Sequence, residues 1–341
     1  MKELELAAKK LTEEIFAVRP GETVTITTDY DSNMTVTRAV ADAVQNAGAH
    51  PVIIQCPTPG SVGKAADPDL PVEVLSAALS VTDVWIEFNH QWLLYSTPFE
   101  RAAAANKKLR YMCLVDFNED LLIRTVGHVD TPRLQVFMRR VAQLTREAGS
   151  MHVMTAAGTD VRFEIDPVHY VACDCGDASF PAVHMLTGQI NVVPRFGSIQ
   201  GVIVFDGCVT PPFARVPDEP IRLTVEDGII TAVDGGEDAA AYEAYLRHFS
   251  DPGMLKMAHL SYGFNPGARL TGDIVEDERV WGATEWGIGY VSDVDAPPCG
   301  QKAVSHSDGI CLRSTVWLDE RCIMRDGVVV DPELAALSPV S

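Results

Sequence analysis

The sequence has no run of about 18 apolar residues, the length that a membrane-spanning helix needs. Its first six residues, Met1 to Leu6, are charged and amphipathic and lack the apolar core of a signal peptide. We therefore expect a cytoplasmic protein with no membrane partner.

Basic side chains are scarce relative to acidic ones. The chain has 27 lysines and arginines against 47 aspartates and glutamates, which gives a formal net charge of −20. A surface this negative repels phosphate backbones and anionic lipids, so we expect no nucleic-acid partner. The 47% hydrophobic and 22% charged residues are ordinary for a folded globular protein.

Pairs of cysteines at zinc-site spacing are also missing. Cys173 and Cys175 form a C-x-C pair, but no second pair follows at a suitable distance. In the cytoplasm the eight cysteines are expected to be reduced, and we interpret this pair as incidental or buried thiols.

The first 150 residues alternate between strand-like and helix-like segments. Residues 23–28 are a β-branched run typical of a buried strand, and residues 35–47 have helical periodicity that ends at Gly48. This alternation predicts a Rossmann-like parallel sheet covered by helices on both faces. No glycine-rich phosphate-binding motif follows the first strand, so the fold gives no evidence for a nucleotide. The other predicted strands are 51–55, 84–88 and 110–115, and the other helices are 2–16, 72–79, 98–106 and 131–148.

From residue 151 onward, short strand-like runs are separated by Gly, Pro and Asp turns. The 341 residues exceed what one hydrophobic core usually serves. We therefore predict an α/β protein of two domains. Residues 1–150 form the α/β scaffold, and residues 151–341 form a mostly β (α+β) metal-binding catalytic domain.

Two segments of the second predicted domain carry candidate metal ligands. In an extended strand, His306 and Asp308 point to the same side, about 7 Å apart at Cα. His259 lies in an apolar run, where a buried imidazole needs partners for both nitrogens. A metal and a hydrogen-bond acceptor would provide them. The alternatives are a His–Asp hydrogen bond at a strand end and a core histidine satisfied by hydrogen bonds alone.

Two histidines and one carboxylate match the facial triad of non-haem Fe(II) oxygenases. The same ligand set also supports zinc-dependent hydrolysis. Ligand identity does not separate these two chemistries.

The segments 259–266 (HLSYGFNP) and 305–308 (SHSD) resemble the ligand segments of the aminopeptidase T superfamily. Within it, the chain is more similar to the 2,5-dihydroxypyridine 5,6-dioxygenase family, and shorter similarities include residues 151–153, 157–160 and 249–252. The resemblance implies an Fe(II)-dependent ring-cleaving dioxygenase with His259, His306 and Asp308 as ligands. It also implies a small hydroxylated N-heteroaromatic substrate, O₂ and a homo-oligomer.

Departures from the peptidase branch concern its second metal. Gln189 stands where those enzymes carry a glutamate ligand, and a two-metal site depends on bridging carboxylates, so we expect one metal. Glu285 stands where they carry a histidine, and it could be a fourth ligand, a general base or an exposed glutamate. A ligand role would favour the alternative function, a zinc- or other divalent-metal-dependent aminopeptidase or amidohydrolase. A non-catalytic binding protein is a third possibility.

The loop after the predicted strand 84–88 offers acid–base candidates, because ligands usually bind at the carboxyl ends of parallel strands. The resemblance implies a catalytic histidine in this loop, where alignment places Tyr95 and a short shift places His90. His90 has the better intrinsic pKa for proton transfer near neutral pH. His169 and His184 are further candidates for lining a pocket.

Overall fold

The computed structural model describes residues 2–340, which form two compact units. Unit 1 contains the chain up to Thr131 together with Gly176–Thr187, and unit 2 contains Pro132–Cys175 and the chain from Gly188 on. Each unit has its own sheets, and the boundary differs from the one expected at residue 150. The long helix α6 (Thr131–Glu147) belongs almost entirely to unit 2.

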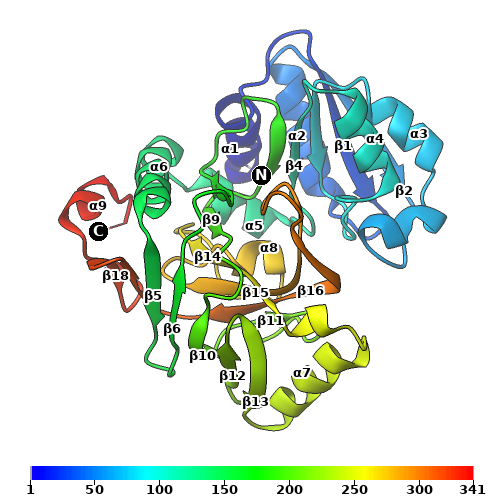
Figure 1. The fold of residues 1–341 in the computed structure, drawn as a ribbon. Helices are drawn as coiled ribbons and strands as arrows, with labels where there is room; N and C mark the ends of the chain where they lie inside the picture. The colour runs from blue at the N-terminus through cyan, green and yellow to red at the C-terminus, as the bar shows by residue number, and fades with distance from the viewer. Residues whose placement is uncertain (1, 341) are drawn as a thin grey trace. The chain divides into compact units, whose positions relative to one another are not determined.

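Unit 1 is built on a parallel five-stranded sheet, in the order β2-β1-β3-β4-β8. Helices α1 and α2 pack against each other, and α3 packs against α4, so that helices flank the sheet (Figure 1). Its strands are β1 (Thr23–Asp29), β2 (His50–Cys56), β3 (Val84–Glu87), β4 (Arg110–Cys113) and β8 (Ala182–Met185). Its helices are α1 (Lys2–Lys10), α2 (Met34–Asn46), α3 (Val72–Leu79), α4 (Thr97–Ala105) and α5 (Glu119–Leu122).

Local signals in the sequence explain these elements. Every residue of β3 and β4 is buried, as expected for parallel strands covered on both faces. The Asn33 side chain caps α2, and the Ser96 hydroxyl caps α4, which satisfies amide groups that the first turn leaves open. The predicted parallel sheet is therefore confirmed, and the fourth strand gains a neighbour, β8, that returns from later in the chain.

Unit 2 contains two antiparallel sheets. The first has eight strands in the order β13-β12-β10-β6-β5-β17-β18-β19, and the second has six in the order β11-β16-β15-β14-β9-β7. The strands of the first are β5 (Ser150–Met154), β6 (Asp160–Glu164), β10 (Gln200–Phe205), β12 (Ile221–Glu226), β13 (Ile229–Asp234), β17 (Thr315–Leu318), β18 (Arg321–Arg325) and β19 (Val328–Val329). Those of the second are β7 (Val171–Asp174), β9 (Gln189–Val192), β11 (Val209–Thr210), β14 (Met257–Gly263), β15 (Thr284–Val291) and β16 (Gln301–Cys311). Its other helices are α7 (Glu237–His248), α8 (Ile274–Asp277) and α9 (Pro332–Leu337).

The β-rich character expected for the second half is thereby confirmed. The α/β fold class as a whole is also confirmed, with the parallel sheet first and the antiparallel sheets after it. All eight cysteines are free thiols.

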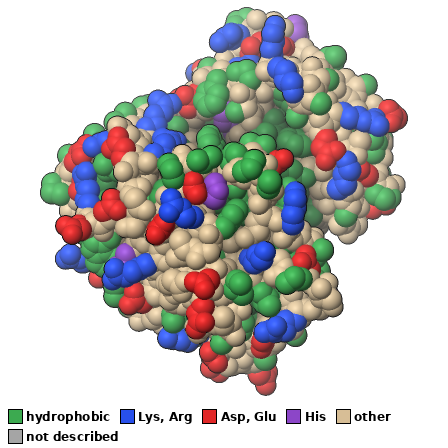
Figure 2. Space-filling model, viewed as in Figure 1, with side chains coloured by type: hydrophobic (Ala, Val, Ile, Leu, Met, Phe, Trp, Pro, Cys, Tyr) green, Lys and Arg blue, Asp and Glu red, His purple; other side chains and the backbone are tan. Residues whose placement is uncertain are grey.

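Two further observations concern the length and hydrophobicity of the helices and the distribution of charge. No helix within residues 2–340 is long and apolar enough to cross a membrane. On the face drawn in Figure 2, acidic and basic side chains are interspersed, so the excess of acid is not gathered there into one patch.

Candidate metal centre

The three predicted ligands lie on neighbouring strands of the six-stranded sheet. His259 on β14 pairs with Gly287 on β15, which in turn pairs with Asp308 on β16. His306 is two residues before Asp308 and therefore shares its face. Strand pairing thus brings together residues that are far apart in the sequence.

Because residue 287 is a glycine, the side chain of His259 can extend over β15 toward Asp308 on β16. Two strand spacings separate β14 from β16, about 10 Å, which is too far for short side chains to meet over an intervening residue. A Cβ atom on Gly287 would lie 2.4 Å from Nε2 of His259 and 2.6 Å from its Cδ2. The imidazole therefore occupies the space that a side chain at residue 287 would fill.

The candidate ligand atoms form a small triangle. Nε2 of His259 is 3.0 Å from Nε2 of His306, which is 2.8 Å from Oδ1 of Asp308. The third side, from Nε2 of His259 to the same Oδ1, measures 3.8 Å. Ligands about 2.1 Å from one ion lie about 3.0 Å apart at right angles and about 3.4 Å apart in a tetrahedron. Two sides of the triangle are close to the right-angle spacing, and the third is shorter than the roughly 4.2 Å between ligands on opposite sides of an ion. A single divalent cation can therefore contact all three atoms.

Hydrogen bonding supports the same fit. Nδ1 of His306 lies 2.9 Å from the carbonyl oxygen of Tyr290, so it carries the proton and leaves the lone pair on Nε2. A neutral His259 protonated on Nδ1 would also direct a lone pair into the triangle. Two imidazole lone pairs and a carboxylate then converge on one point, an arrangement that a cation stabilises.

Glu285 lies beside His259, and its carboxyl group also interacts with Asp308. Its Oε2 is 3.4 Å from Nδ1 of His259 and accepts a 2.6 Å hydrogen bond from the hydroxyl of Ser261. Nδ1 of His259 and Oε1 of Glu285 are both buried without a hydrogen bond. A small rotation of the imidazole would join Nδ1–H to the carboxylate and recover the roughly 1–3 kcal/mol that an unsatisfied buried polar group costs.

The possibility that Glu285 is an exposed glutamate is wrong, because only 1% of the residue is exposed. It is also not one of the three residues whose ligand atoms cluster. The geometry instead fits a carboxylate that orients a metal-binding histidine through its other nitrogen.

A buried polar network continues behind Glu285. The amide nitrogen of Gln189 donates to Ser261 at 3.1 Å and to Glu278 at 2.7 Å. The fully buried guanidinium of Arg279 donates to Oε1 of Gln189 and to Glu278, each at 2.6 Å. Gln189 therefore has its hydrogen-bonding groups engaged in this network, as expected for a neutral side chain that replaces a ligand.

The charges at the centre shift pKa values in a consistent way. Burial alone would lower the pKa of His306, but the Asp308 carboxylate outweighs burial and raises it. Burial would raise the pKa of Asp308, but the two histidines lower it. Burial raises the pKa of Glu285 well above its usual value, and the negative charges of Asp308 and Glu278 add to this effect.

The acid–base candidates belong to unit 1. His90 follows β3, and its Nδ1 is hydrogen-bonded to Asp116, which raises the pKa of the imidazole. The backbone amide of His90 donates to Asp29 at 2.8 Å. This leaves Nε2 of a half-exposed imidazole available for proton exchange, since the Asp116 carboxylate fixes the ring from the other side.

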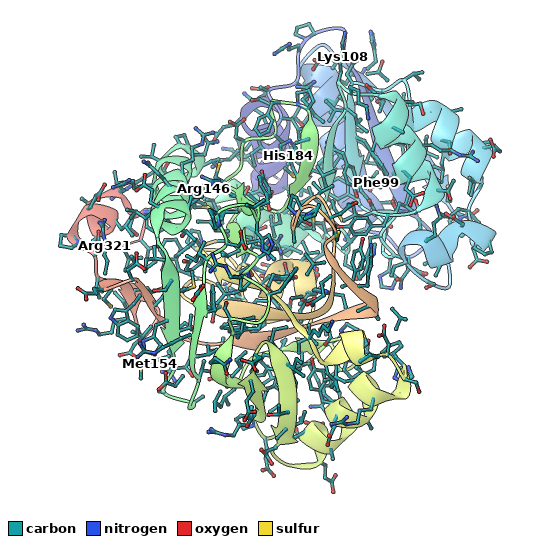
Figure 3. All side chains as sticks on the ribbon, in the orientation of Figure 1. Phe99, Lys108, Arg146, Met154, His184 and Arg321 are labelled. Carbon is teal, nitrogen blue, oxygen red and sulfur yellow. The ribbon has the colours of Figure 1, made fainter. Side chains whose placement is uncertain are left out.

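Tyr95 is differently placed in the same loop. It is 56% exposed, has a positive φ of 67°, and its ring packs edge-on against Phe99. His184 lies on β8 (Figure 3), where its Nε2 lies 3.0 Å from the carbonyl oxygen of Phe180. His169 of unit 2 is similarly engaged, with Nδ1 lying 3.0 Å from the carbonyl oxygen of Pro194. These contacts give both histidines structural partners.

Three groups around the centre were not predicted from the sequence: Gly287, Ser261 and the Tyr290 carbonyl. A glycine inside a strand often marks a close approach of another group, and this signal was available for Gly287. No comparable signal exists for Ser261 or for a backbone carbonyl, because their roles arise from strand pairing.

Comparison with known proteins gives a consistent relationship. A family model described as 2,5-dihydroxypyridine 5,6-dioxygenase matches residues 5–331. The 2,5-dihydroxypyridine 5,6-dioxygenase of Pseudomonas putida KT2440 is 27% identical over 202 residues. This stretch is 56% of the present chain and 57% of that enzyme, so the match covers less than two thirds of the relative.

Solved structures agree on the fold. The structure of 2,5-dihydroxypyridine dioxygenase from Pseudomonas putida KT2440 matches with a TM-score of 0.80 and 20% identity, over 97% of this chain and 98% of that one. Wild-type AmpT from Thermus thermophilus matches with a TM-score of 0.66 and 16% identity, over 96% and 99%. These likenesses concern the fold alone, which this chain shares with both proteins.

Proposed function

The chain belongs to the 2,5-dihydroxypyridine 5,6-dioxygenase family, and from this premise we propose that it is a ring-cleaving dioxygenase. It would use one bound Fe(II) and O₂ to open a small hydroxylated N-heteroaromatic ring similar to 2,5-dihydroxypyridine. The observation that carries the proposal is the convergence of three ligand atoms, from His259, His306 and Asp308. Glu285 neighbours His259 and Asp308, but within residues 2–340 it is not part of this cluster.

The two histidines that would hold the ion are each oriented by a neighbouring group. His306 is fixed by the Tyr290 carbonyl, and His259 faces Glu285, so that each imidazole presents Nε2. When bound by two histidines and one carboxylate, Fe(II) supplies redox chemistry and open positions for substrate and O₂. A fourth protein ligand would reduce those positions, and a cluster of three ligand residues that does not include Glu285 therefore favours the oxygenase.

The substrate hydroxyl must lose a proton, and we assign this step to His90. Its Nδ1 is held by Asp116, which raises the pKa of the imidazole, and Nε2 is left free to exchange a proton with the substrate. Tyr95 is the second candidate in the same loop. We expect His90→Gln to lower kcat by about a hundredfold or more, and Tyr95→Phe to have a smaller effect.

The deciding experiment is an oxygen-electrode assay. The purified protein is stripped of metal, loaded anaerobically with Fe(II) and mixed with 2,5-dihydroxypyridine. We expect one O₂ to be consumed per ring lost, with the ring followed by its ultraviolet absorbance. The His259→Ala variant should retain no iron and consume no O₂.

The competing function is metal-dependent hydrolysis with zinc or another divalent ion. Stoichiometric zinc in the isolated protein, cleavage of a leucyl anilide and no O₂ uptake after Fe(II) loading would replace the oxygenase by the hydrolase. A variant of His259 that still bound one metal ion would remove the proposed ligand set under either function.

A further inference from the structure

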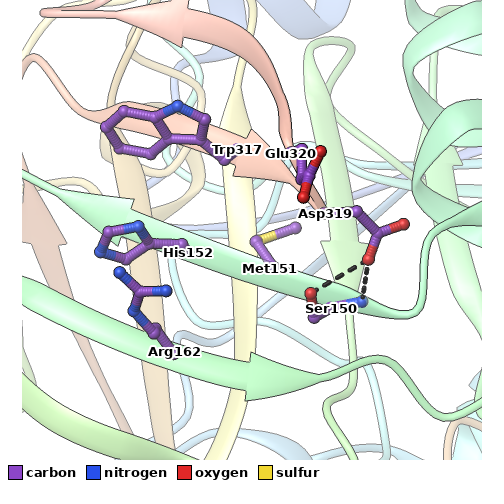
Figure 4. A pocket seen from close by; sticks show the side chains of 7 residues that line it. All are labelled: Ser150, Met151, His152, Arg162, Trp317, Asp319 and Glu320. Atoms are coloured by element: carbon purple, nitrogen blue, oxygen red, sulfur yellow. Dashed lines mark hydrogen bonds between the residues drawn. The ribbon is translucent and has the colours of Figure 1, made fainter.

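The eight-stranded sheet of unit 2 carries a cavity of about 350 Å³ that contains none of the three candidate ligands (Figure 4). It lies over strands β5, β6 and β17. Seven residues line it: Ser150, Met151, His152, Arg162, Trp317, Asp319 and Glu320. Met151 and His152 of this lining belong to residues 151–153, whose resemblance to the family does not involve the candidate metal ligands.

A row of three side chains forms one wall of the cavity. Trp317 on β17 pairs with His152 on β5, which pairs with Arg162 on β6. The His152 ring stacks on Trp317 with centroids 4.9 Å apart and an angle of 21°. Nε2 of the same imidazole is 2.7 Å from a carboxylate oxygen of Asp160. The wall is therefore a flat aromatic surface held by the contact between His152 and Asp160, with the exposed guanidinium of Arg162 beside it.

Two opposite charges of the lining have no partner. Within residues 2–340, neither the guanidinium of Arg162 nor the carboxylate of Glu320 makes an ion pair or a side-chain hydrogen bond. They also do not pair with each other, and Figure 4 draws them at opposite ends of the cavity. Asp319 is different, because Oδ1 accepts hydrogen bonds from the amide and the hydroxyl of Ser150.

We propose that this cavity binds a small zwitterion with a flat apolar body. The carboxylate of the ligand pairs with Arg162, whose planar fork matches a carboxylate. Its ammonium group pairs with Glu320, and its body lies against Trp317. The volume is at the lower end of the range for small-molecule pockets and suits a compound with one ring.

The selection for a zwitterion follows from the charges. An anion alone would satisfy Arg162 but would also meet the negative charges of Glu320 and Asp319. A cation alone would leave Arg162 unpaired. Only a molecule that carries both charges pairs with both ends, and exposed ion pairs are weak enough that either one by itself gives little affinity.

A matched set of probes tests this selection by calorimetric titration of the full-length protein. The zwitterion is 4-(aminomethyl)benzoate, and the singly charged analogues are 4-methylbenzoate and 4-methylbenzylamine. We expect the zwitterion to bind with a Kd of about 1 mM or below, and each analogue to bind about tenfold or more weakly. The saturated analogue 4-(aminomethyl)cyclohexanecarboxylate should bind more weakly than the aromatic zwitterion, because it lacks the ring face for Trp317.

Charge-removing variants locate the binding. Arg162→Gln and Glu320→Gln should each raise the Kd of the zwitterion about tenfold. Arg222→Gln and Glu226→Gln make the same charge changes on β12 of the same sheet, outside the cavity, and should leave the Kd unchanged. Glu320→Gln should not weaken 4-methylbenzoate, because that probe has no ammonium group.

The proposal is overturned if the zwitterion binds no better than its analogues, or if the control variants weaken it as much as Arg162→Gln and Glu320→Gln do. Both outcomes are independent of the metal centre, since O₂ uptake and metal content are measured separately.

Discussion

At the scale of single residues, Glu285 is the group whose role most affects the chemistry. It faces the outer nitrogen of His259 and accepts the Ser261 hydroxyl, so we predict that it orients the imidazole. Glu285→Gln and Ser261→Ala should each weaken Co(II) and Fe(II) binding about tenfold, as is typical for groups behind a metal-ligating histidine. The affinities are measured by anaerobic titration, with the Co(II) absorption spectrum as a report on the ligand set.

Ser307→Ala provides the matched control for Ser261→Ala. Ser307 is equally buried in the same sheet, but its hydroxyl contacts Tyr242 and the carbonyl of Pro211. Its removal should leave metal affinity unchanged. A spectrum showing that Glu285→Gln removes a ligand from Co(II) would instead make Glu285 a direct ligand.

Gly287 gives a second prediction at this scale. A methyl group at this position would lie within 3 Å of the His259 ring, so Gly287→Ala must displace the imidazole. We expect metal affinity to fall about a hundredfold while the fold is retained, because the ring can still turn away from the strand. Gly149→Ala is the control, since its Cβ would come no nearer than 3.6 Å to the Asp319 side chain. Equal metal affinity in both variants would contradict the packing described here.

At the scale of elements, β3 carries a buried acid whose charge couples to stability. Burial raises the pKa of Glu87 to about 7, and the hydrogen bonds from Tyr111 and the Leu93 amide only partly offset this effect. Because the folded pKa exceeds the unfolded value, this contribution to stability is complete below about pH 4.5 and is lost as the pH rises through 7. The loss is on the order of 3 kcal/mol.

Glu87→Gln should remove this dependence. Relative to the wild type, the variant should therefore gain resistance to urea between pH 5 and pH 8, followed by tryptophan fluorescence of the buried Trp85. Glu5→Gln, which changes an exposed glutamate of the same unit, should show no such gain. A constant difference between variant and wild type across this pH range would contradict the raised pKa.

The elements themselves were largely predictable. Apolar periodicity and β-branched runs placed α3 at its observed bounds and β1 within one residue, because these signals are local. The H-x-D spacing likewise placed His306 and Asp308 on one face. What the sequence does not encode locally is the pairing of β14, β15 and β16, and this pairing brings His259 to them across Gly287. The division at Thr131 was missed for a similar reason, since nothing in the residues before α6 marks a linker.

At the scale of the whole molecule, the three candidate ligands all belong to unit 2. Metal at a hundred times its Kd should stabilise the state that binds it by about 2.7 kcal/mol. We predict that hydrogen exchange slows in β14, β15 and β16 on adding metal, and that β1 and β3 are unaffected. Mass spectrometry of peptides from both units measures this. His306→Ala should abolish the protection, and equal protection of both units would contradict a centre held by unit 2 alone.

The return of the chain to form β8 has a consequence for biosynthesis. On the ribosome, β4 is complete at Cys113, but its second neighbour in the sheet exists only once Met185 has been made. Until then, β4 is an edge strand with unpaired backbone groups, which is a template for aggregation. A gene fragment that stops near residue 150 would therefore yield an incomplete sheet, and a fragment intended to fold as unit 1 must carry residues 176–187 as well.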